Sequence, residues 1–317
     1  MNIVVTGAAG FIGSHLCERL AALGHAVEGI DCFSPFYDAR LKQDNAASLH
    51  SRGVTIHKLD LAEDHLDEIL SRVEAVYHCA AQPGLSSSST FDSYVRNNLT
   101  ATFRLLESAA RAPRQPRLIN IATSSVYGAT ATGPETSEPR PTSFYGVTKL
   151  AAEQLALAYG RDRGLPVCSL RLFSVYGPRE RPDKLYPRLI RSLLLGTSLP
   201  LFEGSEQHRR SYTYVDDIVD GLVAVLERWD SCKGEIFNIG NDQAITTGRG
   251  IRIVEDIIGR PVKAERVPRR SGDQLATQAD ITKARKVLSY NPTTAPEEGL
   301  RKTVAWYREY LGRTGEV

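Results

Sequence analysis

The segment that most constrains the fold is a glycine-rich stretch near the start of the chain, TGAAGFIGSH. It places Gly7, Gly10 and Gly13 between a strand-like segment at 2–6 and a segment at 11–23 with the apolar spacing of a helix. The first glycine permits a tight turn, the second lets backbone approach a pyrophosphate, and the third lets helix pack on strand. Because a helix N-terminus attracts phosphates, the stretch predicts a dinucleotide site that includes Phe11 and Ile12.

Acidic residues after the next two predicted strands indicate which dinucleotide binds. Asp31 follows the strand expected at 26–30 and lies 18 residues beyond Gly13. A carboxylate there accepts hydrogen bonds from ribose hydroxyls and repels a 2′-phosphate, so it favours NAD over NADP. Asp60 and Leu61 follow the strand expected at 54–58 and are expected at the adenine end of the same site.

Strand-like and helix-like segments alternate through the first half of the chain. Strands are expected at 2–6, 26–30, 54–58, 75–80, 118–122 and 167–171, and helices at 11–23, 91–111 and 144–163. This alternation predicts an α/β fold with a Rossmann-like, doubly wound parallel sheet. We expect an NAD-binding domain at 1–172, to which segments around 211–243 return, and a smaller mixed α/β C-terminal substrate domain at 173–317.

Composition and charge argue against several other classes of protein. A net charge of +2 over 317 residues provides no basic field for nucleic acid. Five scattered cysteines without a CxxC pair predict reduced thiols and no metal site. The chain opens directly into a strand, and no apolar stretch approaches the roughly 20 residues that cross a bilayer. We therefore expect a cytoplasmic protein without membrane contact.

A second constellation suggests chemistry at the carboxyl edge of the sheet. The strand at 118–122 runs into Thr123-Ser124-Ser125, and Tyr145 and Lys149 follow with the spacing that shares one helical face. The lysine charge is expected to lower the pKa of the tyrosine, because a nearby cation favours the phenolate. A phenolate can act as general base on a sugar hydroxyl. A Tyr-x-x-x-Lys pair alone is common, and its weight here comes from its place behind the glycine loop.

Five motifs together resemble the extended short-chain dehydrogenase/reductase family over essentially the whole chain: TGAAGFIGSH, HCAAQ, TSSVYG, YGVTK and RLFSVYGPRERPD. Within that family they are most similar to nucleotide-sugar 4-epimerases, and among these to UDP-glucuronate 4-epimerases. The resemblance implies Tyr145 as catalytic base, Lys149 as its partner and ribose contact, and Thr123 or Ser124 as a hydroxyl at the sugar 4-OH. It also assigns further residues to the cofactor site: Ala80, Ala81, Gln82, Asn97 and Phe173.

The reaction implied by the resemblance is transient oxidation of a UDP-sugar at C4, most simply the conversion of UDP-glucuronate to UDP-galacturonate. Relatives that eliminate water or carbon dioxide typically carry a carboxylate two positions after the strand-end threonine, and this chain has Ser125 there. A hydroxyl without an activating base removes the C5 proton poorly. The expected outcome is therefore rotation of the 4-keto sugar and re-reduction, which is epimerisation.

A uronate substrate needs a group that holds its carboxylate, because a uronic acid oxidised at C4 is a β-keto acid that loses carbon dioxide readily in one orientation. Arginine suits this role, since its guanidinium binds a carboxylate with two parallel hydrogen bonds. Arg181 matches the arginine of this kind in the uronate epimerases, with Ser174 beside it. A solvated loop arginine is the alternative, because charged residues surround Arg181 in the sequence.

One stretch departs from the pattern of the uronate epimerases. After HCAAQ they tend to have A-G-V-R-Y-S, whereas this chain has Pro83-Gly84-Leu85-Ser86-Ser87-Ser88. The loss of an arginine and a tyrosine raises the hypothesis of relaxed specificity, with UDP-glucose as a second substrate.

The nucleotide end of the substrate requires cations in the second domain. Arg210 and Arg270 match family positions that contact the diphosphate, and Asp273 matches the ribose contact. The neighbouring Arg209 and Arg269 are open alternatives for the same contacts.

Particular residues disfavour the functions that are the alternatives to a UDP-sugar epimerase. A UDP-glucuronate decarboxylase and a hexose 4,6-dehydratase are disfavoured by Ser125. A non-catalytic dinucleotide sensor is disfavoured by the retained Tyr145 and Lys149, although a fold alone does not fix a function. The resemblance further implies a homodimer, with the helices at 91–111 and 144–163 pairing between subunits.

Overall fold

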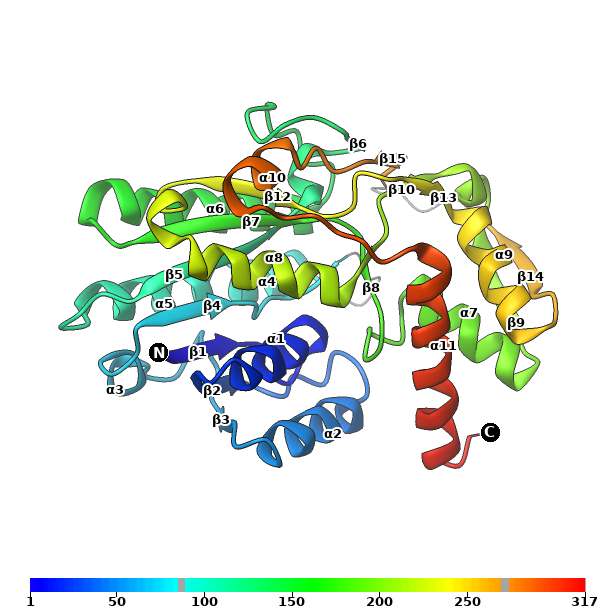
Figure 1. The fold of residues 1–317 in the computed structure, drawn as a ribbon, viewed down its shortest axis with the longest axis horizontal. Coiled ribbons are helices and arrows are strands. Elements are labelled where there is room, and N and C mark those ends of the chain that lie inside the picture. The colour runs from blue at the N-terminus through cyan, green and yellow to red at the C-terminus, as the bar shows by residue number, and fades with distance from the viewer. Residues whose placement is uncertain (85–88, 269–273, 317) are drawn as a thin grey trace.

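A seven-stranded sheet forms the centre of the computed structural model, which describes residues 1–84, 89–268 and 274–316. Its order is β12-β7-β5-β4-β1-β2-β3, and every neighbouring pair is parallel (Figure 1). The strand bounds are β1 Asn2–Thr6, β2 Ala26–Asp31, β3 Thr55–Lys58, β4 Ala75–His78, β5 Arg117–Thr123, β7 Val167–Leu172 and β12 Ile236–Ile239. The strand order reverses between β1 and β4, which opens a ligand crevice at the carboxyl ends of the strands.

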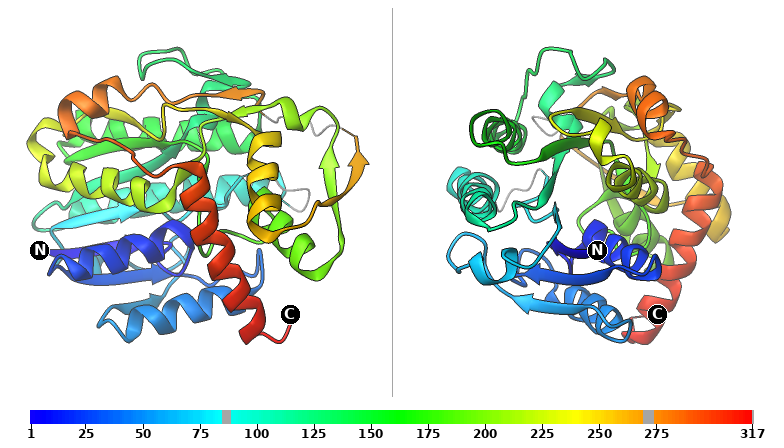
Figure 2. Two further views of the ribbon diagram at one scale, coloured as in Figure 1. Left: turned by 45° about the vertical axis from the view of Figure 1, so that its right-hand side comes forward. Right: turned by 60° about the vertical axis from the view of Figure 1, so that its left-hand side comes forward.

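Helices cover both faces of this sheet (Figure 2). One face carries α1 (Phe11–Ala22), α2 (Ala39–His50) and α8 (Val215–Glu227), and the other carries α3 (Asp67–Leu70), α4 (Phe91–Tyr94), the π-helix η1 (Val95–Thr100), α5 (Ala101–Arg111) and α6 (Phe144–Arg163). Successive strand side chains alternate between the two faces. In β1, Ile3 and Val5 accordingly join one buried cluster and Val4 joins the other.

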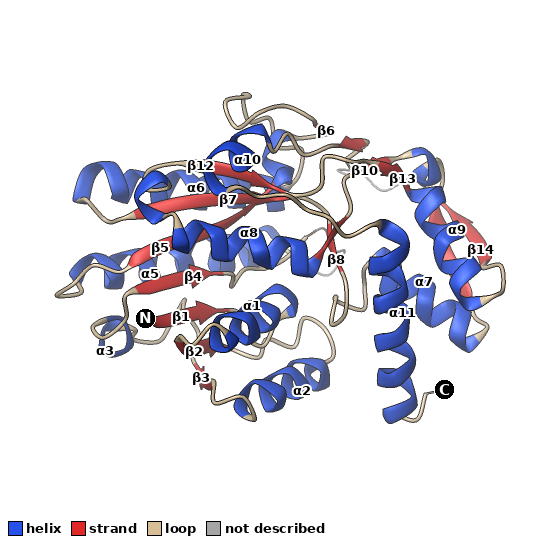
Figure 3. Ribbon diagram, in the orientation of Figure 1, coloured by secondary structure: helices blue, strands red, loops and turns tan. Residues whose placement is uncertain are grey.

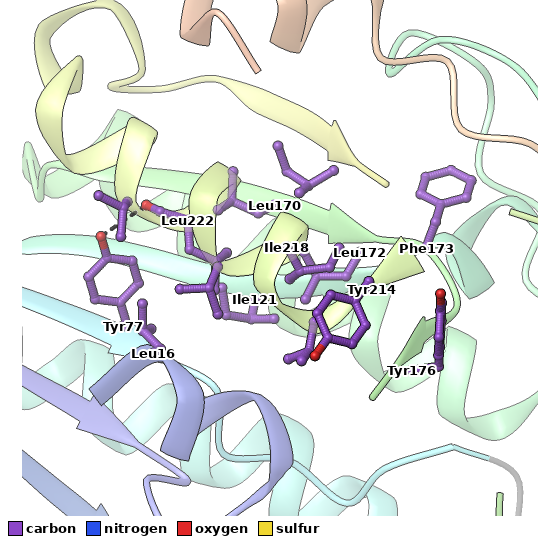
Figure 4. Packing of buried hydrophobic residues seen from close by; sticks show 14 of the residues in the cluster. Leu16, Tyr77, Ile121, Leu170, Leu172, Phe173, Tyr176, Tyr214, Ile218 and Leu222 are labelled. Atoms are coloured by element: carbon purple, nitrogen blue, oxygen red, sulfur yellow. Dashed lines mark hydrogen bonds between the residues drawn. The ribbon is translucent and has the colours of Figure 1, made fainter. Parts of the chain in front are cut away.

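The larger of these clusters lies between the sheet and the pair α1 and α8. Leu16 of α1 and Leu222 of α8 meet Tyr77, whose hydroxyl donates a 3.0 Å hydrogen bond to the Leu222 carbonyl oxygen (Figure 4). The cluster continues through Phe173 and Tyr176 toward the C-terminal part of the chain, so one core supports both parts.

The C-terminal part consists of short strands and four helices beside the carboxyl edge of the sheet (Figure 3). Its helices are α7 Leu185–Leu195, α9 Thr247–Ile258, α10 Thr282–Leu288 and α11 Pro296–Arg313. Its small sheets are β13-β10-β15-β6, β11-β8 and β14-β9. Their strands are β6 Thr130–Ala131, β8 Val175–Tyr176, β9 Ser198–Phe202, β10 Arg209–Arg210, β11 Thr213–Tyr214, β13 Ile245–Thr246, β14 Lys263–Val267 and β15 Ala276–Thr277. Short 3-10 helices lie at Ser124–Tyr127 (η2), Ser205–Gln207 (η3) and Trp229–Ser231 (η4). Among the described residues, no helix is long and apolar enough to cross a membrane.

The predicted fold class is confirmed, with two refinements. The helix expected at 91–111 contains η1, in which the buried Asn98 accepts a 2.7 Å hydrogen bond from the Gln82 N–H and donates one of 3.0 Å to the Thr148 hydroxyl. Strand β12 pairs with β7, and α8 packs on α1, so residues after 211 take part in the central sheet and its cover. The division into domains at 172 and 173 stays a prediction.

A buried ion pair fixes α6 to the sheet. Glu153 of α6 accepts two hydrogen bonds, of 2.7 and 3.0 Å, from the guanidinium of Arg171 of β7, and both side chains are at most 2% exposed. The variant Arg171→Met leaves the carboxylate buried and unpaired, so we expect it to lower the free energy of unfolding by about 3–5 kcal/mol in urea titrations. The double variant Glu153→Leu/Arg171→Met should recover most of that loss. A loss below about 1 kcal/mol for the single variant would contradict this account.

Candidate active site

The glycine loop has the geometry of a phosphate cradle. Gly7 follows β1 with φ +68°, and its N–H donates a 2.7 Å hydrogen bond to the Ile30 carbonyl oxygen. A Cβ on Gly13 would lie 2.2 Å from the Gly7 carbonyl oxygen, and one on Gly10 would lie 3.1 Å from the same atom. Gly13 therefore allows the first turn of α1 to pack directly on the loop, which leaves its N–H groups for a ligand.

Replacing Gly13 with alanine tests this cradle. The added Cβ would meet backbone atoms, so the loop must move, and we expect the purified variant to retain less than about a tenth of the NAD bound by the unmodified protein. The nucleotide released on denaturation gives this quantity directly. Gly312→Ala is the matched control, because a Cβ at that position meets nothing within 4 Å. Equal NAD content in the two variants would refute the role of Gly13.

Asp31 lies at the end of β2 with its carboxylate oriented by the backbone. Its oxygens accept hydrogen bonds from the N–H groups of Ala9, at 3.1 Å, and Phe33, at 2.8 Å, and the Lys42 ammonium lies 3.7 Å away. Asp31 is buried yet lines the cavity described below. Each carboxylate oxygen can accept more than one hydrogen bond, so the group fits the predicted ribose contact.

The hydroxyl residues and the Tyr145–Lys149 pair converge at the carboxyl ends of β5 and β7. Thr123 ends β5, and its hydroxyl oxygen accepts a 3.2 Å hydrogen bond from the Ser125 N–H at the start of η2. Tyr145 and Lys149 lie in the first turns of α6, whose N-terminus is capped by the Ser143 hydroxyl at 3.1 Å from the Gly146 nitrogen. The Lys149 side chain is almost completely buried.

Electrostatics around Tyr145 differ in one respect from the prediction. Burial raises the pKa of the Tyr145 phenol, and the groups that oppose this rise are the Thr123 hydroxyl and the Arg181 guanidinium, not Lys149. Burial also lowers the pKa of Lys149 to about 8, because desolvation disfavours the ammonium. The expectation that Lys149 lowers the tyrosine pKa is therefore corrected, and Arg181 is the cation that acts on the phenol.

The loop between β8 and α7 carries Arg181 into the same region. One guanidinium nitrogen donates a 3.0 Å hydrogen bond to the Pro83 carbonyl oxygen, and another donates one of 3.2 Å to Asp183. The cation lies 5.4 Å from the centre of the Phe36 ring, and the residue is 7% exposed. Arg181 is therefore not a solvated loop residue. Two of its five N–H donors are used in these two contacts.

A cavity of about 730 Å³ brings most of the predicted residues together. Those that line it are Gly7, Gly10, Phe11, Ile12, Gly13, Asp31, Asp60, Leu61, Ala80, Ala81, Gln82, Asn97, Thr123, Ser124, Ser125, Tyr145, Lys149, Ser174, Arg181 and Arg210. A second cavity, of about 330 Å³, shares Arg210 with the first, whereas Arg209 lines neither. Arg270, Asp273 and the alternative Arg269 lie outside the described residues.

Phe173, which the resemblance assigns to the cofactor site, does not line the cavity, and its role there stays a prediction. Its side chain is completely buried, and its ring centre lies 6.3 Å from that of Tyr127. A Cβ on Gly240 would lie 2.7 Å from the Phe173 Cβ, so this neighbour needs to be a glycine. Phe173 supports the end of β7 from within the core and is not among the residues that line the cavity.

Sequence reasoning missed several polar residues that line this site, among them Lys42, Glu180 and Gln274. Lys42 lines the cavity beside Asp31, and Gln274 donates hydrogen bonds to the carbonyl oxygens of Ser124, at 3.2 Å, and Gly128, at 2.9 Å. Glu180 lines the cavity next to Arg181. Each comes from a charged or polar stretch that predicts a solvated loop or helix face, and only tertiary packing reveals its place.

Comparison with known proteins identifies the family. A family model described as the NAD dependent epimerase/dehydratase family matches residues 3–240. The chain belongs to this family. Its glycine cradle, oriented Asp31 and continuous cavity fit the dinucleotide in the family's description, so NAD is the cofactor and the prediction of NAD is confirmed.

Known proteins and solved structures match along nearly the whole chain. UDP-glucuronate 4-epimerase 6 of Arabidopsis thaliana is 35% identical over 333 residues, which cover 98% of this chain and 72% of that protein. The uncharacterized UDP-glucose epimerase YtcB of Bacillus subtilis strain 168 is 39% identical over 311 residues, which cover 96% and 98%. The crystal structure of UDP-glucuronic acid 4-epimerase from Bacillus cereus in complex with UDP-glucuronic acid and NAD has a TM-score of 0.93 and 38% identity, covering 98% of this chain and 100% of that one. The protein is thus an NAD-dependent nucleotide-sugar epimerase, as its motifs predict.

Proposed function

We propose that the protein interconverts UDP-glucuronate and UDP-galacturonate by epimerisation at C4. The observation that carries this proposal is the buried guanidinium of Arg181, which lines the same cavity as Tyr145 and acts electrostatically on its phenol. A cation in that position suits a sugar that carries a carboxylate at C6. The similarity to UDP-glucuronate 4-epimerases supports the same substrate.

Tyr145, Thr123 and Lys149 have separate roles in the proposed reaction. Tyr145 takes the proton of the sugar 4-hydroxyl and later returns it. The Thr123 hydroxyl at the end of β5 orients the sugar 4-oxygen toward Tyr145. When bound, NAD supplies a reversible hydride acceptor and is regenerated in each cycle. Lys149, buried below Tyr145 on α6, is positioned for the ribose of the cofactor.

Two features favour epimerisation over elimination or decarboxylation. Ser125 provides a hydroxyl, hydrogen-bonded to Thr123 at 3.3 Å, where a proton acceptor would be needed to deprotonate C5. Arg181 is held from two sides by Pro83 and Asp183, so it can fix the C6 carboxylate in one orientation. Holding that carboxylate away from the perpendicular to the ketone plane prevents loss of carbon dioxide from the oxidised sugar.

UDP-glucose is the second candidate substrate. The chain has Ser86 and Ser87 where the uronate epimerases tend to carry an arginine and a tyrosine, and residues 85–88 lie outside the described part. Measuring kcat/KM for UDP-glucuronate and UDP-glucose tests the preference. We expect the uronate to be favoured by at least about tenfold, as one charge-assisted contact would give. Equal kcat/KM values for the two substrates would contradict the proposal that Arg181 binds the sugar carboxylate.

We also propose that the protein forms a homodimer through the face of α4, α5 and α6. Four large apolar side chains on this face are 45–60% exposed: Phe91, Phe103, Phe144 and Val147. The Phe91 and Phe144 rings lie 5.2 Å apart, so they form one patch rather than isolated residues. Sedimentation of the purified protein would measure its mass in solution, and a monomer would contradict this assignment.

A further inference from the structure

Glu180 is a buried carboxyl group that the mechanism above does not use. It lies between β8 and α7, is 7% exposed, and its Oε2 has no hydrogen-bond partner among the described residues. Its backbone is held firmly, because its carbonyl oxygen accepts a 2.6 Å hydrogen bond from the Tyr307 hydroxyl of α11. A buried carboxyl oxygen without a donor is costly, so its retention at a cavity wall indicates a partner that arrives with a ligand.

The position of Glu180 places it on the path of that ligand. Five residues line both cavities and so mark their junction: Ser174, Val175, Glu180, Lys184 and Arg210. The first cavity contains Tyr145 and Arg181, and the second extends toward Tyr186 and His208. A sugar nucleotide that reaches from Tyr145 to Arg210 must pass this junction, which Glu180 lines directly beside its sequence neighbour Arg181.

The surroundings favour the neutral form of Glu180. Burial raises the pKa of its carboxyl group to about 8, against the opposing effect of Lys184 and Arg181. The titratable groups that face it come from its own loop, from β8, α7 and α11, and from the segment between β10 and β11: Arg181, Asp183, Lys184, Tyr176, Tyr186, Tyr307 and Tyr212. Burial raises the pKa of all four tyrosines, so they stay neutral while Glu180 titrates.

We propose that Glu180 is a specificity-determining residue that contacts the C6 substituent of the bound sugar and discriminates between charged and neutral sugars. This inference rests on the proposed function. As a carboxylic acid, Glu180 donates a hydrogen bond to the sugar carboxylate that Arg181 holds. As a carboxylate, it repels that group and competes for Arg181, whereas a 6-hydroxyl can donate to it. Uronate binding therefore needs protonated Glu180, and hexose binding does not.

The sign of the pH dependence follows from the raised pKa. Glu180 is protonated below about pH 8 and ionises as the pH rises, so uronate affinity should fall in alkaline solution. The test measures dissociation constants by calorimetry in the NAD-bound Tyr145→Phe variant, which lowers kcat about 10³-fold and removes the titration of Tyr145. Between about pH 7 and about pH 9 we expect the dissociation constant of UDP-glucuronate to rise about tenfold and that of UDP-glucose to change less than about twofold.

The variant Tyr145→Phe/Glu180→Gln isolates the contribution of Glu180. Glutamine keeps an N–H donor that does not titrate, so the dissociation constant of UDP-glucuronate should become independent of pH. Glu309→Gln, at an exposed position of α11, is the matched control and should keep the tenfold change. UDP-glucose carries the same diphosphate as UDP-glucuronate, so any titration of Lys184 or His208 would change the dissociation constants of both ligands equally.

Two results would overturn the inference. One is an equal rise in the dissociation constants of both ligands with rising pH. This result can be obtained without any variant of Glu180. The other is an unchanged pH dependence in the Glu180→Gln background. Failure of the proposed function is a different result, since it would appear as no binding of UDP-glucuronate at any pH.

Discussion

Replacing Tyr145 with phenylalanine is expected to lower kcat by about 10³-fold while leaving NAD bound. The change removes only the hydroxyl that exchanges a proton with the sugar, and general acid–base catalysis typically contributes this much. The ring keeps its place beside Tyr94, whose ring centre lies 6.3 Å away. Steady-state turnover and the NAD content of the purified variant measure the two effects separately.

Tyr159→Phe provides a control on the same helix. Its hydroxyl bonds to Glu107 at the far end of α6, away from the cavity, and its loss should leave kcat nearly unchanged. If Tyr145→Phe kept more than about a tenth of the activity, another group would have to serve as the base.

Replacing Arg181 with methionine is expected to lower kcat/KM for UDP-glucuronate by about 100-fold or more, because the sugar carboxylate would lose its charged partner in a buried site. Activity on UDP-glucose should change far less. The variant should also release some UDP-pentose and carbon dioxide, since a carboxylate that rotates freely can reach the orientation from which the β-keto acid decarboxylates. Product analysis by chromatography separates the epimer from the pentose.

Two further variants define the role of Arg181. Lysine keeps the charge and loses the two parallel hydrogen bonds. The kcat/KM of Arg181→Lys for UDP-glucuronate should therefore lie between those of the unmodified protein and Arg181→Met. Arg308→Met, on the exposed side of α11, should leave both substrates unaffected. An equal loss of activity on both substrates in Arg181→Met would assign the residue a structural role instead.

The central sheet could be predicted from sequence because its elements are long and regular. The expected strands begin and end within one residue of their observed bounds, except that β4 ends at His78, two residues short of the expected 80. The π-helix η1 could not be predicted, since its apolar spacing resembles that of the α-helices around it. The cost of that turn is offset by the buried hydrogen bonds of Asn98, which depend on Gln82 and Thr148 from other elements.

The C-terminal sheets illustrate the opposite case. The four-stranded sheet β13-β10-β15-β6 consists of two-residue strands, too short to show any periodicity, from segments up to 147 residues apart between Thr130 and Thr277. Glu180 was missed for a related reason. Charged neighbours in GPRERPD predict a solvated loop, and burial comes only when α11 and α7 pack against it.

Incubating the purified protein with UDP-glucuronate, without added NAD, tests the central claim most directly. The proposed mechanism regenerates NAD in each cycle, and the glycine loop and Asp31 fit a site that retains it, so cofactor that remains from expression should suffice. The account predicts conversion to UDP-galacturonate, with both epimers present at the end point. A UDP-pentose as the main product, or conversion that consumes NAD in proportion to the sugar, would contradict it.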